Sequence, residues 1–260
     1  MVAGRGPQAP LAAGRAERAR RRTDAGTDRL DAGNAAAHTR TRLKSLVLVH
    51  GAATGPCVFD GWSDAFPGVT LEAVDLHAGL NVAEAGMANY EACTVRAAEG
   101  LPRPLALLGW SMGGLVAMLA ARRIGPEILV LLEPSAPAGV PAGPLERAEL
   151  HPHPGLYDGE EVYGPFPPGV RPRPESALAR AERKRGLPVT ELPASTLVVY
   201  GDSLPQERGR ALAHRYGAAE LHLPDADHWA LVREPNARLA IAAALERVAA
   251  ARSQCRGSTA

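Results

Sequence analysis

Six short apolar runs, rich in leucine and β-branched residues, are the feature that most limits the folds open to this chain. They lie at residues 43–51, 69–76, 104–110, 127–134, 195–202 and 218–224. Stretches with helical spacing separate most of them, at residues 84–99, 112–123, 207–216 and 236–251. Continuous apolar strands that alternate with helices are typical of a parallel sheet with helices on both faces. The sequence therefore predicts an α/β fold around a mostly parallel central sheet.

Three stretches of different composition flank or interrupt this alternation. Residues 1–42 contain almost no large apolar side chains, so we expect a disordered tail rich in Arg, Ala and Gly. Residues 137–193 hold 12 of the 23 prolines and one helical piece, which favours a cap inserted over the sheet. The core would then comprise residues 43–136 and 194–252, and residues 253–260 would form a second disordered tail.

Charge and cysteine content exclude several classes of protein. The net charge is +1, and the nine arginines and four acids of residues 1–42 leave the remainder at −4. A mildly acidic body gives no reason to expect nucleic-acid binding. Three cysteines without C-x-x-C spacing predict neither a disulfide framework nor a zinc site. No apolar run approaches the ~20 residues of a membrane helix, and no secretory signal is apparent, so a cytoplasmic protein is expected.

A serine follows the third apolar run directly. In open parallel sheets, ligands bind beyond the carboxyl ends of the strands. There the sequence from Gly109 to Gly113 reads G-x-S-x-G, and a helical stretch begins at Met112. This arrangement is typical of a nucleophilic serine on a sharp strand-to-helix turn, with small neighbours that let the chain pack closely. Ser111 is the predicted nucleophile, and the Met112 N–H is the predicted first donor to an oxyanion.

A nucleophilic serine needs a base and a second oxyanion donor. His228 follows the last strand in a polar loop and is the last histidine of the chain, which makes it the predicted base. The loop after the first strand, residues 50–56, is rich in small residues, and the Ala52 N–H is the predicted second donor. Other histidines lie in predicted helices, strands or the proline-rich stretch: His77, His151, His153, His214 and His222. His151 and His153 have no carboxylate or cysteine cluster beside them, so no metal site is expected.

These motifs together resemble the α/β-hydrolase fold family. They are HGAATGPCVFDGW at 50–62, LLGWSMGGLVA at 107–117, a strand ending in YGD, and PDADHWALVREP at 224–235. The resemblance covers about residues 43–251, with the proline-rich insertion in the place of that family's cap. It implies acyl-transfer chemistry on Ser111 with no metal or organic cofactor. The tryptophan before the serine is similar to that of bacterial carboxylesterases acting on acyl-carrier-protein esters.

The third member of the triad departs from the family's pattern. Family members often carry the acid three residues after the glycine that ends the strand before the last, and here that position is Leu204. Two carboxylates can replace it: Asp202, or Glu133 at the end of the strand after the serine, where certain haloalkane dehalogenases carry a glutamate. We favour Glu133, because its strand end lies next to that of Ser111. The alternative roles are a turn cap for Asp202 and a structural carboxylate for Glu133.

The predicted function is hydrolysis of a small-molecule ester or thioester, free or bound to a carrier protein, by a carboxylesterase or thioesterase (EC 3.1). A second interpretation is tailoring of a polyketide or another natural product on the same fold, by thioester release, acyl elimination or C–C cleavage. A third is a hydrolase-like binding protein without catalysis. Predicted substrate contacts are aromatic: Trp110, Tyr157, Tyr163, Phe166 and Trp229. Basic residues of the insertion would either meet an acidic partner or form a solvated helix face: Arg173, Arg180, Arg183, Lys184 and Arg185. The sequence leaves the oligomeric state open.

Overall fold

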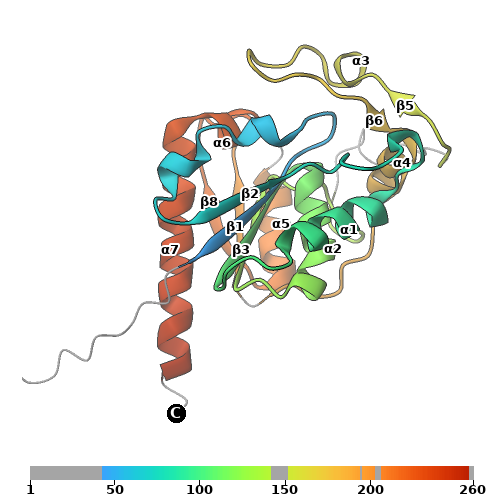
Figure 1. The fold of residues 1–260 in the computed structure, drawn as a ribbon. Coiled ribbons are helices and arrows are strands. Elements are labelled where there is room, and N and C mark those ends of the chain that lie inside the picture. Colours follow the sequence, from blue (N-terminus) through green and yellow to red (C-terminus); the bar gives the residue numbers. More distant parts are fainter. Residues whose placement is uncertain (1–42, 142–151, 194, 203–205, 258–260) are drawn as a thin grey trace, which may run out of the picture. The chain divides into compact units, whose positions relative to one another are not determined.

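The computed structural model describes residues 43–141, 152–193, 195–202 and 206–257. At its centre lies a six-stranded sheet in the order β2-β1-β3-β4-β7-β8, and every neighbouring pair is parallel (Figure 1). The strands are β1 (Ser45–Val49), β2 (Thr70–Val74), β3 (Leu105–Trp110), β4 (Ile128–Leu132), β7 (Thr196–Tyr200) and β8 (Ala219–His222). Each lies within one of the six predicted runs, so the predicted α/β fold is confirmed.

Helices cover both faces of the sheet (Figure 1). One face carries α1 (Met87–Ala98), α2 (Met112–Ile124) and α5 (Gln206–Tyr216). The other carries α6 (Ala230–Arg233), α7 (Pro235–Gly257) and two short 3₁₀ helices, η1 (Pro56–Phe59) and η2 (Trp62–Ala65). A third, η3 (Val82–Glu84), precedes α1.

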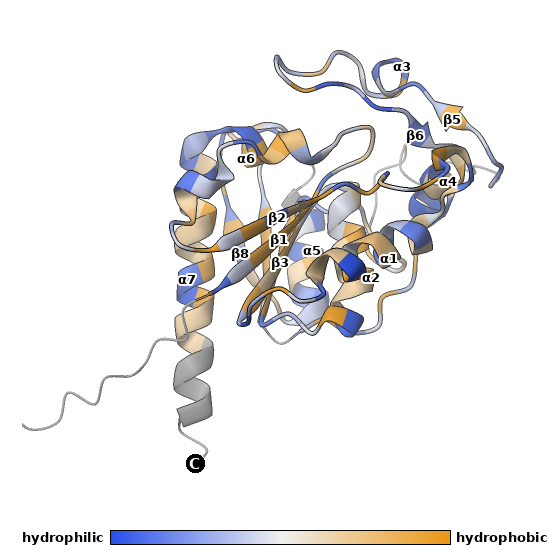
Figure 2. Cartoon of the chain, in the orientation of Figure 1, coloured by the Kyte–Doolittle hydropathy of each residue, from blue (hydrophilic) through white to orange (hydrophobic). Residues whose placement is uncertain are grey.

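Successive side chains of the strands enter two separate hydrophobic cores. Val47 and Val49 of β1 pack with α1 and α2, whereas Leu46 and Leu48 pack with α7 and the 3₁₀ helices. This follows from the two-residue side-chain period of a strand. A strand with both faces covered has no polar side, which is why β1 and β3 are hydrophobic along most of their length (Figure 2).

Helix α7 extends beyond its predicted end at residue 251 and reaches Gly257. No glycine or proline lies between residues 236 and 256, so nothing in the sequence breaks the helix earlier. Residues 253–257 therefore continue the helix and do not belong to a tail. The predicted tail at residues 1–42 and residues 258–260 lie outside the described residues. Within the described ranges, no helix combines the length and apolar character needed to cross a membrane.

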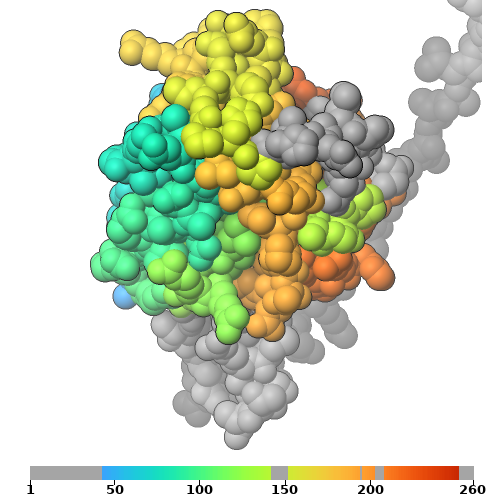
Figure 3. Space-filling view, turned by 90° about the vertical axis from the view of Figure 1, so that its right-hand side faces the viewer, coloured from blue at the N-terminus to red at the C-terminus, as the bar shows by residue number. Residues whose placement is uncertain are grey.

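Residues 152–193, called the cap segment below, contain two short strands and two helices. β5 (Leu156–Tyr157) and β6 (Glu175–Ser176) pair antiparallel, and α3 (Gly159–Tyr163) and α4 (Ala177–Arg185) follow them in turn. In the space-filling view this segment, drawn in yellow, lies beside the teal residues around α1 (Figure 3). The Gly155 N–H donates to Ala83 O at 2.8 Å, and the Met87 N–H donates to Glu182 Oε2 at 2.7 Å. The cap segment is thus joined to the turn before α1.

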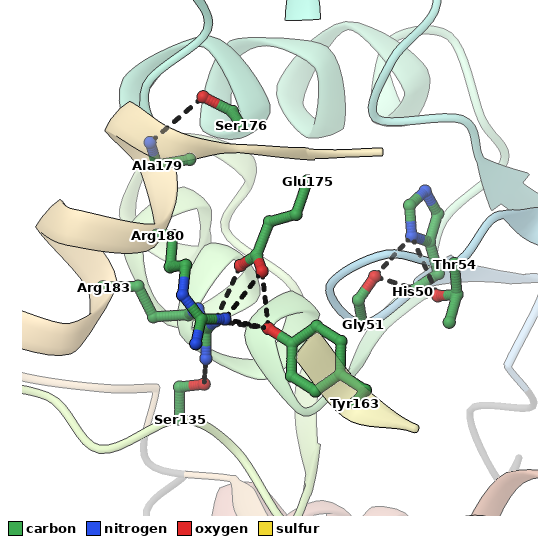
Figure 4. Close-up of polar contacts among 10 residues, drawn as sticks. All are labelled: His50, Gly51, Thr54, Ser135, Tyr163, Glu175, Ser176, Ala179, Arg180 and Arg183. Atoms are coloured by element: carbon green, nitrogen blue, oxygen red, sulfur yellow. Dashed lines mark hydrogen bonds and ion pairs between the residues drawn. The ribbon is translucent and has the colours of Figure 1, made fainter. Parts of the chain in front are cut away.

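A buried ionic cluster lies inside the cap segment (Figure 4). Glu175, with a side chain only 1% exposed, accepts hydrogen bonds from Arg180 at 2.9 Å, Arg183 at 2.7 Å and the Tyr163 hydroxyl at 2.6 Å. Although burial opposes it, these neighbours lower the pKa of Glu175. Although Tyr163 as a whole is 42% exposed, desolvation of its hydroxyl among these groups, together with the Glu175 carboxylate, raises its pKa to about 12, so the phenol stays protonated. The alternative of a solvated helix face is wrong for Arg183, because its side chain is 8% exposed and paired.

Replacing Glu175 with glutamine is expected to lower the free energy of unfolding at pH 7 by about 3–5 kcal/mol, because it leaves two guanidinium groups without their carboxylate. The lowered pKa means that the wild-type contribution is complete above about pH 4.3 and is lost as the pH falls further. Urea unfolding at pH 7 and pH 3.5 measures both effects. Glu91→Gln, which alters a partly exposed pair with Arg123, is the control and should cost less than about 1 kcal/mol. Equal losses in the two variants would contradict the prediction.

Candidate active site

Ser111 occupies a strained turn between β3 and α2. Its backbone has φ 56° and ψ −122°, a conformation that residues other than glycine rarely adopt. Hydrogen bonds hold it there: its N–H donates to Leu132 O at 3.0 Å, and its carbonyl accepts from Gly114 at 3.0 Å and Ser135 at 2.9 Å. A Cβ at Gly109 or Gly114 would collide with neighbouring backbone, so these glycines are what let the turn pack. The predicted sharp strand-to-helix turn is therefore present.

Of the two carboxylates that sequence reasoning considered, the structure places Glu133 against His228. Glu133 directly follows β4, its side chain is 1% exposed, and its Oε2 lies 2.6 Å from His228 Nδ1. Its second oxygen accepts the Gly201 N–H at 2.9 Å. A carboxylate at Nδ1 fixes the proton on that nitrogen and leaves Nε2 as an acceptor. Asp202 lies elsewhere: its side chain is 42% exposed, and it contacts His222 Nε2 at 2.7 Å.

Trp110 links the end of β3 to the loop that carries His228. Its indole N–H donates to the His228 carbonyl at 3.0 Å, and the two rings lie 4.8 Å apart. Trp110 is buried, and its ring packs on Trp229 at 5.0 Å, which in turn packs on Phe166 of the cap segment at 5.3 Å. Because Ser111 is the next residue, the same strand end positions both the serine and the loop of the histidine.

The five aromatic residues predicted to contact substrate fall into two groups. Trp110, Phe166 and Trp229 form the series of ring contacts just described, which reaches His228 through Trp110. Tyr157 and Tyr163 instead lie with Arg180, whose guanidinium is 5.4 Å and 5.5 Å from the centres of their rings. The contacts of these two tyrosines therefore lie with the ionic cluster of the cap segment.

The loop after β1 orients the peptide that precedes Ala52 (Figure 4). The Gly51 carbonyl lies 2.9 Å from Thr54 Oγ, which donates to it, and 2.9 Å from His50 Nδ1. The Leu76 N–H donates to His50 Nε2 at 3.3 Å, which assigns the proton to Nδ1. Because the C=O and N–H of a trans peptide point in opposite directions, the Ala52 N–H is directed away from His50 and Thr54.

Burial keeps His50 neutral, as this arrangement requires. His50 has no exposed surface, and burial lowers its pKa to about 4. His50 was not predicted as a site residue, although its position at the end of a buried strand and next to a glycine could have indicated it.

The loop after β1 also lies against Ser111. A Cβ at Gly51 would stand 3.1 Å from Ser111 Cβ and 2.9 Å from the Trp110 ring. Met112 begins α2, so its N–H has no acceptor within the helix, and the helix dipole favours negative charge at this end. The geometry thus brings a serine, a histidine with a buried carboxylate, and the backbone N–H groups of Ala52 and Met112 to one edge of the sheet.

Two of the histidines that the sequence analysis did not assign to the site have partners elsewhere. His222 pairs with Asp202, and His153 lies beside Tyr157. His151 and Leu204 are outside the described residues. Among the residues that the structure describes, no three His, Cys, Asp or Glu side chains are grouped as metal ligands would be.

Comparison with known proteins gives one family and a set of similar folds. A sequence model described as the alpha/beta hydrolase family matches residues 46–243. Among curated proteins, none matches this sequence. Similar solved structures include a pyrethroid hydrolase from Sphingobium faniae JZ-2, with 17% identity and a TM-score of 0.56, covering 82% of this chain and 99% of that chain.

Two esterases are similar in the same way. Polyneuridine aldehyde esterase has 18% identity and a TM-score of 0.57, covering 78% of this chain and 99% of its own. A thermophilic esterase from Thermogutta terrifontis, solved with malate bound, has 23% identity and a TM-score of 0.57, covering 80% and 92%. At these identities the likeness concerns the fold.

Proposed function

Because the chain belongs to the alpha/beta hydrolase family, we propose that it is a serine hydrolase that cleaves an ester or thioester through an acyl-enzyme on Ser111. The observation that carries the proposal is the 2.6 Å contact between His228 Nδ1 and the buried Glu133 carboxylate, beside a serine on a strained strand-to-helix turn. Strained backbone of this kind persists where the surrounding structure holds it, and it is concentrated at functional sites.

In the proposed reaction, Ser111 Oγ attacks the carbonyl carbon of the substrate, and His228 Nε2 takes the hydroxyl proton. The oxygen that becomes negative accepts hydrogen bonds from the N–H groups of Ala52 and Met112. The intermediate then collapses, and the imidazolium gives its proton to the departing alcohol or thiol. Glu133 stays ionised throughout and stabilises the imidazolium.

Water completes the cycle. It attacks the acyl carbon while His228 removes one of its protons, and the second intermediate releases the carboxylic acid and the Ser111 hydroxyl. These steps balance without a metal or an organic cofactor.

The proposed substrate is a small molecule with an apolar group next to its ester or thioester, free or attached to a carrier protein. Phe166 and Trp229 support this, because their rings continue the aromatic packing from Trp110, which lies beside His228, and they offer apolar surface. The printed names of the similar structures, esterases and a pyrethroid hydrolase, favour carboxylic esters over other acyl groups.

Labelling with a fluorophosphonate, combined with a screen of p-nitrophenyl esters and acyl thioesters, tests the proposal. One covalent adduct at Ser111, located by mass spectrometry, and turnover of short-chain esters are expected. Ser135→Ala should label like the wild type, because Ser135 is buried and serves as a nearby serine control. Absence of labelling would refute the proposal in favour of a binding protein. Labelling without hydrolysis of any ester or thioester would favour natural-product tailoring.

A further inference from the structure

Arg173 of the cap segment holds the loop after β1 in two ways. Its backbone N–H donates to Ala53 O at 2.9 Å, and its guanidinium Nη1 lies 2.7 Å from Asp75 Oδ1, just beyond β2. The same guanidinium covers Gly55, where an added Cβ would stand 3.0 Å from Nη1. One residue therefore fastens the loop to the end of the neighbouring strand.

These contacts act on the residue that follows the proposed oxyanion donor. Hydrogen bonds to Gly51 O fix the peptide before Ala52, and the bond from Arg173 fixes the carbonyl of the residue after it. Ala53 has φ 53°, an unfavourable value for alanine that needs surrounding contacts to persist. Ala52 and Ala53 carry only methyl groups, so hydrogen bonds rather than large side chains set the direction of the Ala52 N–H.

Asp75 connects Arg173 to the other half of the loop. Its Oδ1 also accepts the His77 N–H at 3.0 Å, and the intervening Leu76 N–H donates to His50. Although burial opposes it, the hydrogen bond from Arg173 lowers the pKa of Asp75, so this carboxylate stays ionised in the neutral range. A continuous series of contacts thus runs from Arg173 through Asp75 and the adjacent Leu76 N–H to His50, and of these residues Arg173 comes from the cap segment.

We propose that Arg173 is a positioning residue, which holds the Ala52 N–H where the oxyanion develops and so makes the oxyanion hole depend on the cap segment. This inference rests on the proposed function. Arg173 therefore affects the stability of the transition state and does not affect the binding of the ground-state ester. Removing one oxyanion donor costs about 10²–10³ in kcat, so losing its support should cost less.

Arg173→Met keeps the backbone bond to Ala53 but removes the guanidinium, which joins Arg173 to Asp75 and covers Gly55. Loss of this anchor is expected to lower kcat for a p-nitrophenyl ester about 10- to 100-fold while KM changes less than about 2-fold. The affinity for a boronic acid, which forms a tetrahedral anion on the serine, should fall by a similar factor. Arg173→Lys should recover part of the loss. Asp75→Asn should show a similar loss that does not add to that of Arg173→Met, because the two residues act through one contact.

Arg233→Met is the matched control. Arg233 also joins core and cap segment, since its guanidinium donates to Cys57 O at 3.5 Å and Pro168 O at 3.2 Å, but these contacts do not reach Ala53 or Asp75. Its kcat and boronate affinity should stay within about 2-fold of the wild type. Equal effects of the two methionine variants, or a change confined to KM, would overturn the positioning role while leaving the esterase proposal intact. A wild-type protein that neither labels nor hydrolyses esters would instead refute the proposed function, and this inference with it.

Discussion

Replacing Ser111 with alanine is expected to lower kcat for ester hydrolysis by a factor on the order of 10⁶, to the level that binding and the oxyanion donors alone provide. The hydroxyl oxygen is the atom that forms the acyl-enzyme in the proposed reaction. The measurement is kcat on a p-nitrophenyl ester, with purified enzyme at concentrations high enough to detect the residual rate.

The fold of the variant should be unchanged. The hydrogen bonds that hold position 111 use its backbone N–H and carbonyl, which alanine retains. Circular dichroism and the melting temperature check this directly. Turnover within 10-fold of the wild type in a folded Ser111→Ala protein would show that the reaction uses another nucleophile.

Replacing Glu133 with glutamine is expected to lower kcat by about 10⁴. The amide keeps an oxygen for the Gly201 N–H, so the loop remains in place. However, it then directs its NH₂ group at His228 Nδ1, which must become an acceptor. The proton moves to Nε2, and the imidazole can no longer take the proton of Ser111. Single-turnover and steady-state rates between pH 6 and 9 measure the loss.

Asp202→Asn is the control for this prediction. Asp202 contacts His222 Nε2 at 2.7 Å and accepts the Asp225 N–H at 3.0 Å, whereas His228 Nδ1 contacts Glu133. Its replacement should change kcat less than about 3-fold, since surface substitutions away from a site rarely cost more than 0.5 kcal/mol. A large loss in Asp202→Asn together with a small loss in Glu133→Gln would assign the acid to Asp202.

The strands of the sheet could be predicted almost completely from the sequence. Apolar runs such as residues 104–110 are buried on both faces, so their composition alone separates them from the helices. The end of α7 could not be predicted as well, because Ala251 carries no stop signal and Gly257 is the first one available. The short elements β5, β6 and α3 were not predicted, since two to five residues leave no measurable periodicity.

The residues of the site could likewise be predicted only where their neighbours in the chain mark them. Ser111 and His228 could be proposed because each is marked by its neighbours in the chain. The choice between Glu133 and Asp202 depended on which side chain turns toward His228, and Glu133 does so from a backbone with φ 37°, which no local pattern indicates. For the same reason, the sequence did not predict that Arg183 turns inward to Glu175. Glu175 lies 8 residues earlier in the chain, and the contact between the two depends on how the helix packs.

Ser111, the proposed nucleophile, and Glu133, which contacts His228, lie at the two ends of one crossover, β3–α2–β4. Ser135, two residues beyond Glu133, closes this unit by its hydrogen bond to the Ser111 carbonyl. Replacement of the cap segment by that of a related protein should therefore preserve the site only when the exchanged segment begins after Ser135. The β3–α2–β4 crossover then stays intact.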